Sequence, residues 1–131
     1  MEIAKACEHG RFVVQFDKAE AYTPAVLQLL NEACRLAQDS LQVRFYGHYG
    51  TRLDATFLRY LPEVSNLSID CLSEIIHEEE IGRLPKLSRL RFGVFELNRS
   101  DFLDTIDLAR IVDLTLIENR KRNIDLSPLA R

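Results

Sequence analysis

Residues 61–69 read LPEVSNLSI, residues 84–92 read LPKLSRLRF and residues 108–116 read LARIVDLTL. Each segment carries apolar side chains at its first, fourth, seventh and ninth positions, in the pattern L-x-x-L-x-x-L-x-L. The segments recur about every two dozen residues, a repeat length that is typical of stacked repeat architectures. The pattern therefore predicts that these units bury their leucines in one shared core, because no single unit could bury them alone.

The rest of the chain supplies strands and helices that fit the same plan. Alternating apolar residues, many of them β-branched or aromatic, predict strands over 11–17, 41–46, 66–70, 89–94 and 113–117. Thr23 and Pro24 predict the start of a helix that runs to about Gln38, because threonine caps helices and proline is tolerated at the first helical position. Asp54 predicts the start of a short helix that ends near Tyr60.

On these segments the chain resembles the leucine-rich repeat family, well over residues 41–131 and more loosely over residues 11–40. The resemblance implies an α/β fold, a right-handed βα solenoid with about five parallel strands on a concave face and helices and turns on the convex side. Residues 1–131 then form a single domain, with a longer N-terminal β-α unit at 1–40 and the repeats at 41–131.

The last residues begin another repeat that the sequence does not finish. Residues 126–129 read LSPL and match the start of the earlier segments, but the sequence ends at Arg131, before a further strand. We therefore expect an uncapped C-terminal edge, which a longer array, a second copy of the chain or a partner would cover. A homodimer through this edge is one expectation.

In the leucine-rich repeat family the concave strand face is the usual site of protein binding. The residues expected on that face are Gln15, Gln42, Arg44, Tyr46, Ser68, Asp70, Arg91 and Thr115, with Tyr49 on the adjoining glycine loop. Arg44, Tyr46, Asp70 and Arg91 would form a mixed-charge patch with an aromatic anchor, and tyrosine and arginine are enriched at binding hot spots. We therefore expect a non-catalytic protein-binding scaffold, for example an inhibitor or immunity-type protein.

Two other functions stay open. One is nucleic-acid binding through two basic runs, Arg83 to Arg91 and Arg120 to Arg122. Neighbouring acidic residues and the formal net charge of −3 offset these runs, so the sequence disfavours a nucleic-acid partner. The other alternative is a structural or assembly adaptor that acts by self-association.

The sequence gives no sign of an enzyme, a cofactor or a metal site. His9, His48 and His77 are scattered and lack the spacing of metal ligands. The chain has no Gly-x-Ser-x-Gly motif and no phosphate-binding glycine loop. These absences favour a binding protein over a catalyst.

Cysteine usage and hydropathy predict a cytoplasmic protein that does not cross a membrane. No apolar run is long enough for a transmembrane helix, and the N-terminus lacks the apolar core of a secretory signal. The three cysteines cannot all pair with one another. Because Cys34 and Cys71 lie in apolar patterns, we predict that both are reduced thiols in the core.

Overall fold

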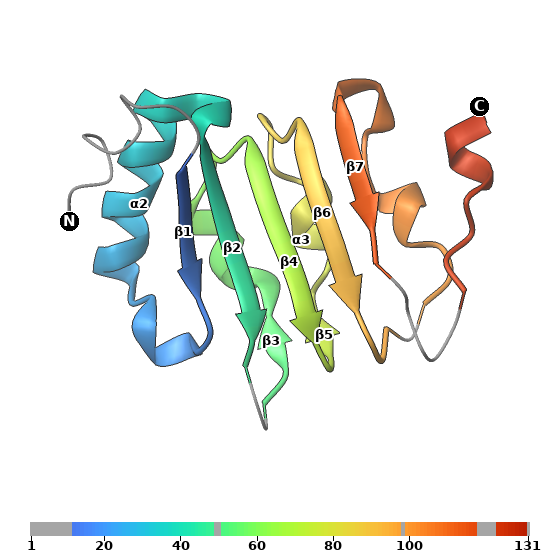
Figure 1. The fold of residues 1–131 in the computed structure, drawn as a ribbon, viewed down its shortest axis with the longest axis horizontal. Helices are drawn as coiled ribbons and strands as arrows, with labels where there is room; N and C mark the ends of the chain where they lie inside the picture. Colours follow the sequence, from blue (N-terminus) through green and yellow to red (C-terminus); the bar gives the residue numbers. More distant parts are fainter. Residues whose placement is uncertain (1–11, 49–50, 98, 118–122, 131) are drawn as a thin grey trace.

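The computed structural model describes residues 12–48, 51–97, 99–117 and 123–130. Its centre is a sheet of five parallel strands, which lie side by side in chain order (Figure 1). The strands are β1 (Phe12–Phe16), β2 (Leu41–Gly47), β4 (Asn66–Leu72), β6 (Arg89–Val94) and β7 (Asp113–Leu116). The predicted α/β class and the predicted parallel strands are confirmed, and each strand lies close to its expected position.

The first unit folds as the sequence predicts. Helix α2 (Pro24–Ala37) connects β1 to β2, and the Thr23 hydroxyl accepts a hydrogen bond from the Val26 amide at 3.3 Å. Leu27, Leu30 and Cys34 are buried on one side of this helix. Their spacing of three and four residues places them on a single apolar stripe that packs on the sheet.

The three L-x-x-L-x-x-L-x-L segments occupy equivalent positions. In each one the carbonyl of the first leucine accepts a hydrogen bond from the amide three residues later: Val64 to Leu61 at 3.1 Å, Leu87 to Leu84 at 3.4 Å and Ile111 to Leu108 at 3.2 Å. After this turn the strands pair in register, with Leu67 opposite Leu90 and Leu90 opposite Leu114. The repeat in the sequence is therefore a repeat in the backbone.

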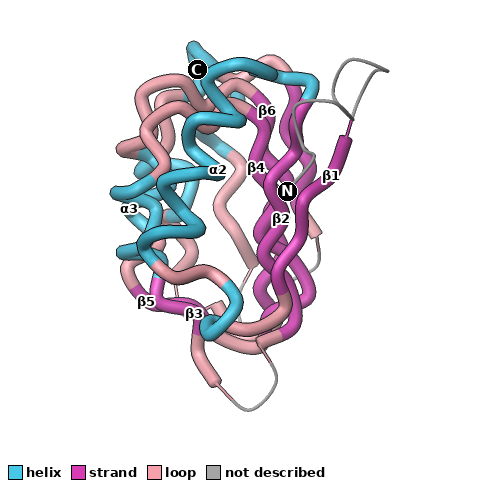
Figure 2. Tube along the Cα trace, turned by 90° about the vertical axis from the view of Figure 1, so that its left-hand side faces the viewer, coloured by secondary structure: helices cyan, strands magenta, loops and turns pink. Residues whose placement is uncertain are grey.

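The connections between strands lie on one side of the sheet (Figure 2). Besides α2 they include the short helix α3 (Glu79–Gly82) and a two-stranded parallel sheet of β3 (Leu53–Asp54) and β5 (Ile75–Ile76). The short helix expected over 54–60 is a 3-10 helix, Ala55–Tyr60, and the Asp54 carboxylate caps it by accepting from the Thr56 amide at 3.0 Å. Other 3-10 helices are Ala19–Ala21, Gln38–Ser40, Phe102–Thr105, Leu108–Arg110 and Ser127–Ala130.

The core fills the space between the sheet and these connections. One row of core side chains runs across the paired strands as Val14, Val43, Leu67, Leu90 and Leu114, and the next row runs as Phe16, Phe45, Ile69, Phe92 and Leu116. Phe92 also stacks on Phe102 from the connecting layer, with ring centroids 3.9 Å apart. Each fully buried leucine or phenylalanine contributes about 1.5–3 kcal/mol of transfer free energy.

One core assignment is wrong. Cys34 is buried as predicted, but Cys71 is exposed. In the pairing of β2 with β4, Tyr46 faces Asp70 and the next residue, Gly47, faces Leu72, so Cys71 is the extra residue of a β-bulge. Its φ of 54° turns its side chain out of the alternation that the sequence pattern assumes.

The C-terminal residues pack beside the last strand. Pro128 is buried in the 3-10 helix Ser127–Ala130, and Ile124 packs against the core. The Asp125 amide donates to the Ser100 carbonyl at 2.7 Å. In the part of the chain that the structure describes, β7 has no strand on its outer side.

Candidate functional site

The side of the sheet opposite the connections is called the open face here, because no described helix lies over it (Figure 2). Five of the predicted site residues form one row across all five strands of this face. Consecutive members of the row are paired in the sheet: Gln15 with Arg44, Arg44 with Ser68, Ser68 with Arg91 and Arg91 with Thr115. The predicted alternation of core and surface side chains therefore holds across the sheet.

The other predicted site residues lie in neighbouring rows, with one exception. Gln42 is paired with Asn66, and both line a hollow of about 160 Å³ on the open face. Tyr46 is paired with Asp70 near the C-terminal ends of the strands. Tyr49 lies outside the described residues.

A network of ion pairs and hydrogen bonds occupies the centre of the open face. Arg44 binds the Asp70 carboxylate through two parallel contacts, Nε to Oδ1 at 2.8 Å and Nη2 to Oδ2 at 2.9 Å. The third nitrogen of Arg44, Nη1, donates to Gln15 Oε1 at 3.1 Å, and the guanidinium lies 4.3 Å from the centre of the Tyr46 ring. Bidentate pairing and stacking together hold this arginine in one orientation.

Asp70 and Ser68 are buried too deeply to contact a partner directly. Asp70 is 2% exposed and Ser68 is fully buried, because the longer arginine side chains extend over them. Ser68 Oγ donates to Asp70 Oδ1 at 3.1 Å. Burial alone would raise the pKa of Asp70. The hydrogen bonds and charge of Arg44, together with the hydrogen bond from Ser68, hold this pKa below its usual value. The two residues support the surface from beneath.

Arg91 is the least constrained cation of this cluster. Its Nε lies 4.0 Å from Asp70 Oδ2, beyond hydrogen-bond distance, and half of its side chain is exposed. Asp70 already accepts two hydrogen bonds from Arg44. Arg91 therefore presents a partly compensated positive charge beside the Tyr46 and Arg44 pair.

The first basic run does not form an uncompensated surface. Each of its cations has an acidic partner within 4.0 Å: Arg83 with Glu80, Lys86 with Glu63, Arg89 with Asp39 and Asp113, and Arg91 with Asp70. The second run, Arg120 to Arg122, lies outside the described residues. Phosphate binding gains most from cations without such partners.

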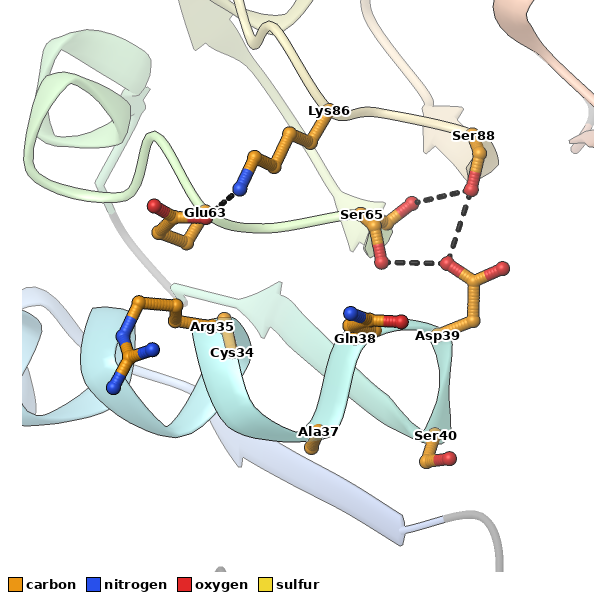
Figure 3. A pocket seen from close by; sticks show the side chains of 10 residues that line it. All are labelled: Cys34, Arg35, Ala37, Gln38, Asp39, Ser40, Glu63, Ser65, Lys86 and Ser88. Atoms are coloured by element: carbon orange, nitrogen blue, oxygen red, sulfur yellow. Dashed lines mark hydrogen bonds and ion pairs between the residues drawn. The ribbon is translucent and has the colours of Figure 1, made fainter.

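A polar clamp that the sequence did not reveal joins the first unit to two repeats. The Asp39 Oδ1 atom accepts from Ser65 Oγ at 2.6 Å and from Ser88 Oγ at 3.1 Å (Figure 3). The hydrogen bond from Ser65, with those from Ser88 and Arg89, lowers the pKa of Asp39. Ser65 and Ser88 are the fifth residues of consecutive repeats, which is the signal that could have identified them.

A cavity of about 420 Å³ lies beside this clamp, with Lys86 and Glu63 paired across its rim (Figure 3). The charged side chains that line the cavity are all engaged in ion pairs or hydrogen bonds with other side chains. Asp39 accepts from Arg89 as well as from the two serines, and Arg35 is bound to Glu32. This arrangement serves to fix the junction between α2, β2 and the repeats.

A second group missed from the sequence joins the start of α2 to the end of β2. Tyr22 Oη lies 2.7 Å from His48 Nε2, and His48 Nδ1 lies 2.8 Å from the Tyr46 carbonyl oxygen. The carbonyl can only accept, so His48 donates from Nδ1, and in the neutral ring Nε2 then accepts from the Tyr22 hydroxyl. Burial, with the charges of Glu20 and Asp54, raises the pKa of Tyr22 to about 12.

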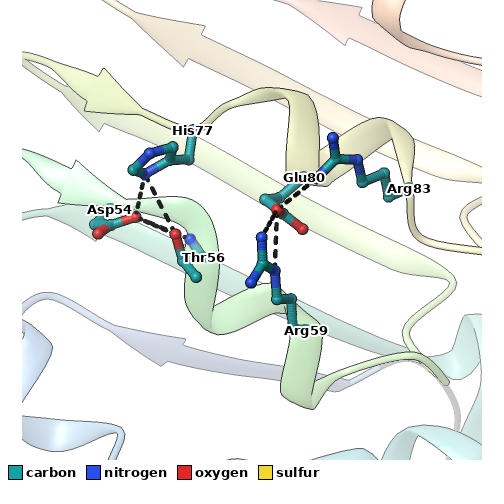
Figure 4. Close-up of polar contacts among 6 residues, drawn as sticks. All are labelled: Asp54, Thr56, Arg59, His77, Glu80 and Arg83. Carbon is teal, nitrogen blue, oxygen red and sulfur yellow. Dashed lines mark hydrogen bonds and ion pairs between the residues drawn. The ribbon is translucent and has the colours of Figure 1, made fainter.

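The covered side carries two charged groups next to each other (Figure 4). In one, Asp54 Oδ1 lies 2.9 Å from His77 Nδ1, and Thr56 Oγ1 lies 3.3 Å from the same nitrogen. A catalytic relay needs the carboxylate and the hydroxyl on opposite ring nitrogens. Here both face Nδ1, so this group lacks the geometry of a nucleophilic triad. In the other group, Glu80 is paired with Arg59 and Arg83.

Two further observations bear on function. No three histidine, cysteine or acidic side chains among the described residues are grouped closely enough to hold a metal ion. Across the same residues, the helices are all too short or too polar to span a bilayer.

Comparisons of the chain with protein-family models, with curated proteins and with solved structures found no match.

Proposed function

We propose that this protein is a non-catalytic, protein-binding scaffold of the leucine-rich repeat type, a short right-handed solenoid that binds a partner protein on its open face. Three observations support the solenoid proposal: the repeats share equivalent turns, their three strands pair in register, and the connections lie on one side of the sheet.

The observation that carries the proposal is the preorganised centre of the open face. Arg44 is held by Asp70, Gln15 and the Tyr46 ring, and Arg91 stands half exposed beside them. Side chains that are fixed before binding lose little conformational entropy when a partner arrives. A fixed aromatic residue next to a partly compensated arginine also supplies the residue types that dominate binding energy.

A small acidic protein with such a face fits an inhibitor or immunity-type role, in which the face covers a functional surface of the partner. Arg91 would receive a carboxylate of that partner, because Asp70 is already occupied by Arg44. The ring of Tyr46 would then pack against an apolar group beside that carboxylate.

Affinity capture with matched double variants tests this proposal. The full chain, the variant Tyr46→Ala with Arg91→Ala, and the control Tyr60→Ala with Arg52→Ala serve as baits in an extract of the native cells. The control residues are also a tyrosine and an arginine, and Tyr60 (45%) and Arg52 (62%) are well exposed on the covered side. A protein captured by the wild type and the control, but not by the open-face variant, is the expected result.

Capture that survives the open-face variant would contradict the proposal. Thermal melting of all baits provides the folding control, since a variant that unfolds would lose its partner for another reason. We expect both double variants to melt close to the wild type, because their side chains lie at the surface.

A further inference from the structure

A second candidate binding site lies on the covered side, where a groove of about 360 Å³ separates two consecutive repeats. Its walls and floor are formed by the side chains of Leu58, Arg59, Pro62, Arg83, Leu84 and Pro85. The groove is far from the rows of the open face because it is built from residues of the connecting layer. It therefore does not depend on the function proposed above.

The two arginines of the groove are clamped by one buried carboxylate. Glu80 is 4% exposed, and its Oε1 atom accepts from Arg59 Nη2 at 2.8 Å, from Arg59 Nε at 3.1 Å and from Arg83 Nη1 at 2.8 Å (Figure 4). Both guanidiniums remain largely exposed. The hydrogen bonds from Arg59, with the charge of Arg83, lower the pKa of Glu80, so this carboxylate stays ionised.

The clamp leaves one positive charge in excess. Two guanidiniums share a single carboxylate, which gives these three side chains a net charge of about +1 at neutral pH, and the charges of Asp54 and Glu79 act more weakly on Arg59. Within the described residues, Nη1 of Arg59 and both Nη2 and Nε of Arg83 have no hydrogen-bond acceptor. These donors are held in place and are available to an anionic group from outside.

The rest of the groove is apolar and rigid. Leu58 and Leu84 are buried at its floor, and Pro62 and Pro85 are exposed beside them. The prolines hold equivalent positions in two consecutive repeats, directly after the first leucine of each. Proline has no backbone N–H and a fixed φ, so the pair presents an apolar surface without a backbone donor, and the Pro85 carbonyl already accepts from Arg110 Nη1 at 2.9 Å.

We propose that this groove binds an acidic segment of a partner protein, with a carboxylate on Arg59 and Arg83 and a neighbouring apolar side chain over Pro62 and Pro85. The positive charge of the two arginines favours a carboxylate, and the apolar floor of the groove favours an apolar side chain next to it. A nucleic acid gains its affinity from several uncompensated cations, whereas this groove offers one excess charge.

An NMR titration of the isotope-labelled full chain tests the proposal. The probe is the peptide acetyl-Ser-Leu-Glu-Leu-Glu-Ser-amide, and its control has glutamine in place of both glutamates. We expect the acidic peptide to cause saturable shifts of the amides of Leu58, Arg59 and Leu84 at millimolar concentration. The glutamine peptide should bind at least about tenfold more weakly, because it lacks the charge-assisted hydrogen bonds.

Single arginine variants locate the binding. Arg83→Gln removes the excess charge but leaves the two hydrogen bonds from Arg59 to Glu80, so the fold should be retained. We expect this variant to bind the acidic peptide at least about tenfold more weakly than the wild type, because a charged hydrogen bond is lost. Arg52→Gln is the matched control, since Arg52 is equally exposed (62%, against 64% for Arg83) and lies outside the groove.

Three results would overturn the proposal. The first is the lack of saturable shifts with the acidic peptide at any concentration tested. The second is the lack of a difference in either matched comparison, between the acidic and glutamine peptides or between the two arginine variants. The third is a thymidine octanucleotide that shifts the same amides at a lower concentration than the peptide, which would assign the groove to phosphate.

Discussion

The two faces of the sheet belong to the same strands, but different interactions stabilise their buried side chains. On the covered face, Leu67 and Phe92 are buried among other apolar groups, as are Leu90 and Ile69, with which they pair. On the open face, Asp70 is buried just as deeply, but it depends on directed contacts from Arg44 and Ser68. The difference shows that apolar burial decides the fold, whereas the open face is fixed by a few specific polar contacts.

The largest effect should come from the covered face. Leu67→Ala should lower the free energy of unfolding by about 2–5 kcal/mol, because it removes a fully buried side chain and leaves a cavity. Leu114→Ala, at the equivalent position of the last repeat, should cost about 1–2 kcal/mol, since Leu114 is only partly buried. Urea denaturation measures both values. Equal losses would mean that another chain covers β7 in solution.

Two glycines give the next comparison. A Cβ atom at Gly82, on the covered side, would lie 1.8 Å from the Thr105 carbonyl oxygen, and the backbone there would have to move. Gly82→Ala should therefore destabilise by about 1–3 kcal/mol, although alanine favours helices. A Cβ atom at Gly93, on the open face, would lie 2.6 Å from the Cβ of Ile117. Rotation of the Ile117 side chain cannot move its Cβ, so the backbone at the end of β7 must shift, but Gly93→Ala should cost less than Gly82→Ala because its closest contact is longer. A larger loss at Gly93, measured by thermal melting, would contradict this assignment.

The sequence predicted the covered face better than the open one. The L-x-x-L-x-x-L-x-L spacing predicted the positions of the strands and the alternation of core and surface side chains, because the apolar pattern is set by the local backbone. It did not reveal that Asp70 and Glu80 are buried, since this depends on arginines 21 to 26 residues away that cover them. The bulge at Cys71 could not be predicted either, because a single extra residue leaves the apolar pattern almost unchanged.

Acid should weaken the open face. The pKa of Asp70 is lower in the folded chain than its unfolded value of about 3.9, so its contribution is present above that value and is lost as the pH falls through the folded pKa. Between pH 5 and pH 3, the unfolding free energy of Asp70→Asn should therefore fall less steeply than that of the wild type. At pH 7 the same variant should be less stable by about 1–3 kcal/mol. Parallel curves would show that Arg44 does not perturb this carboxylate.

The smallest effect should come from His77, on the covered side. The hydrogen bond and charge of Asp54 raise its pKa, so its contribution is present below the unfolded value of about 6.5 and is lost as the pH rises through the folded pKa. Both side chains are half exposed, so the change in stability will be slight. An NMR titration of His77 should give a lower pKa in Asp54→Asn than in the wild type. An unchanged pKa would rule out the ion pair in solution.

The most direct test of the central proposal is the dissociation constant of the captured partner, measured by calorimetry with the two matched double variants. If the partner binds the open face, Tyr46→Ala with Arg91→Ala should weaken binding about a hundredfold or more, as expected for the loss of two hot-spot residues. Tyr60→Ala with Arg52→Ala should stay close to the wild type. Similar losses for both double variants, or a loss confined to Tyr60→Ala with Arg52→Ala, would contradict binding through the open face.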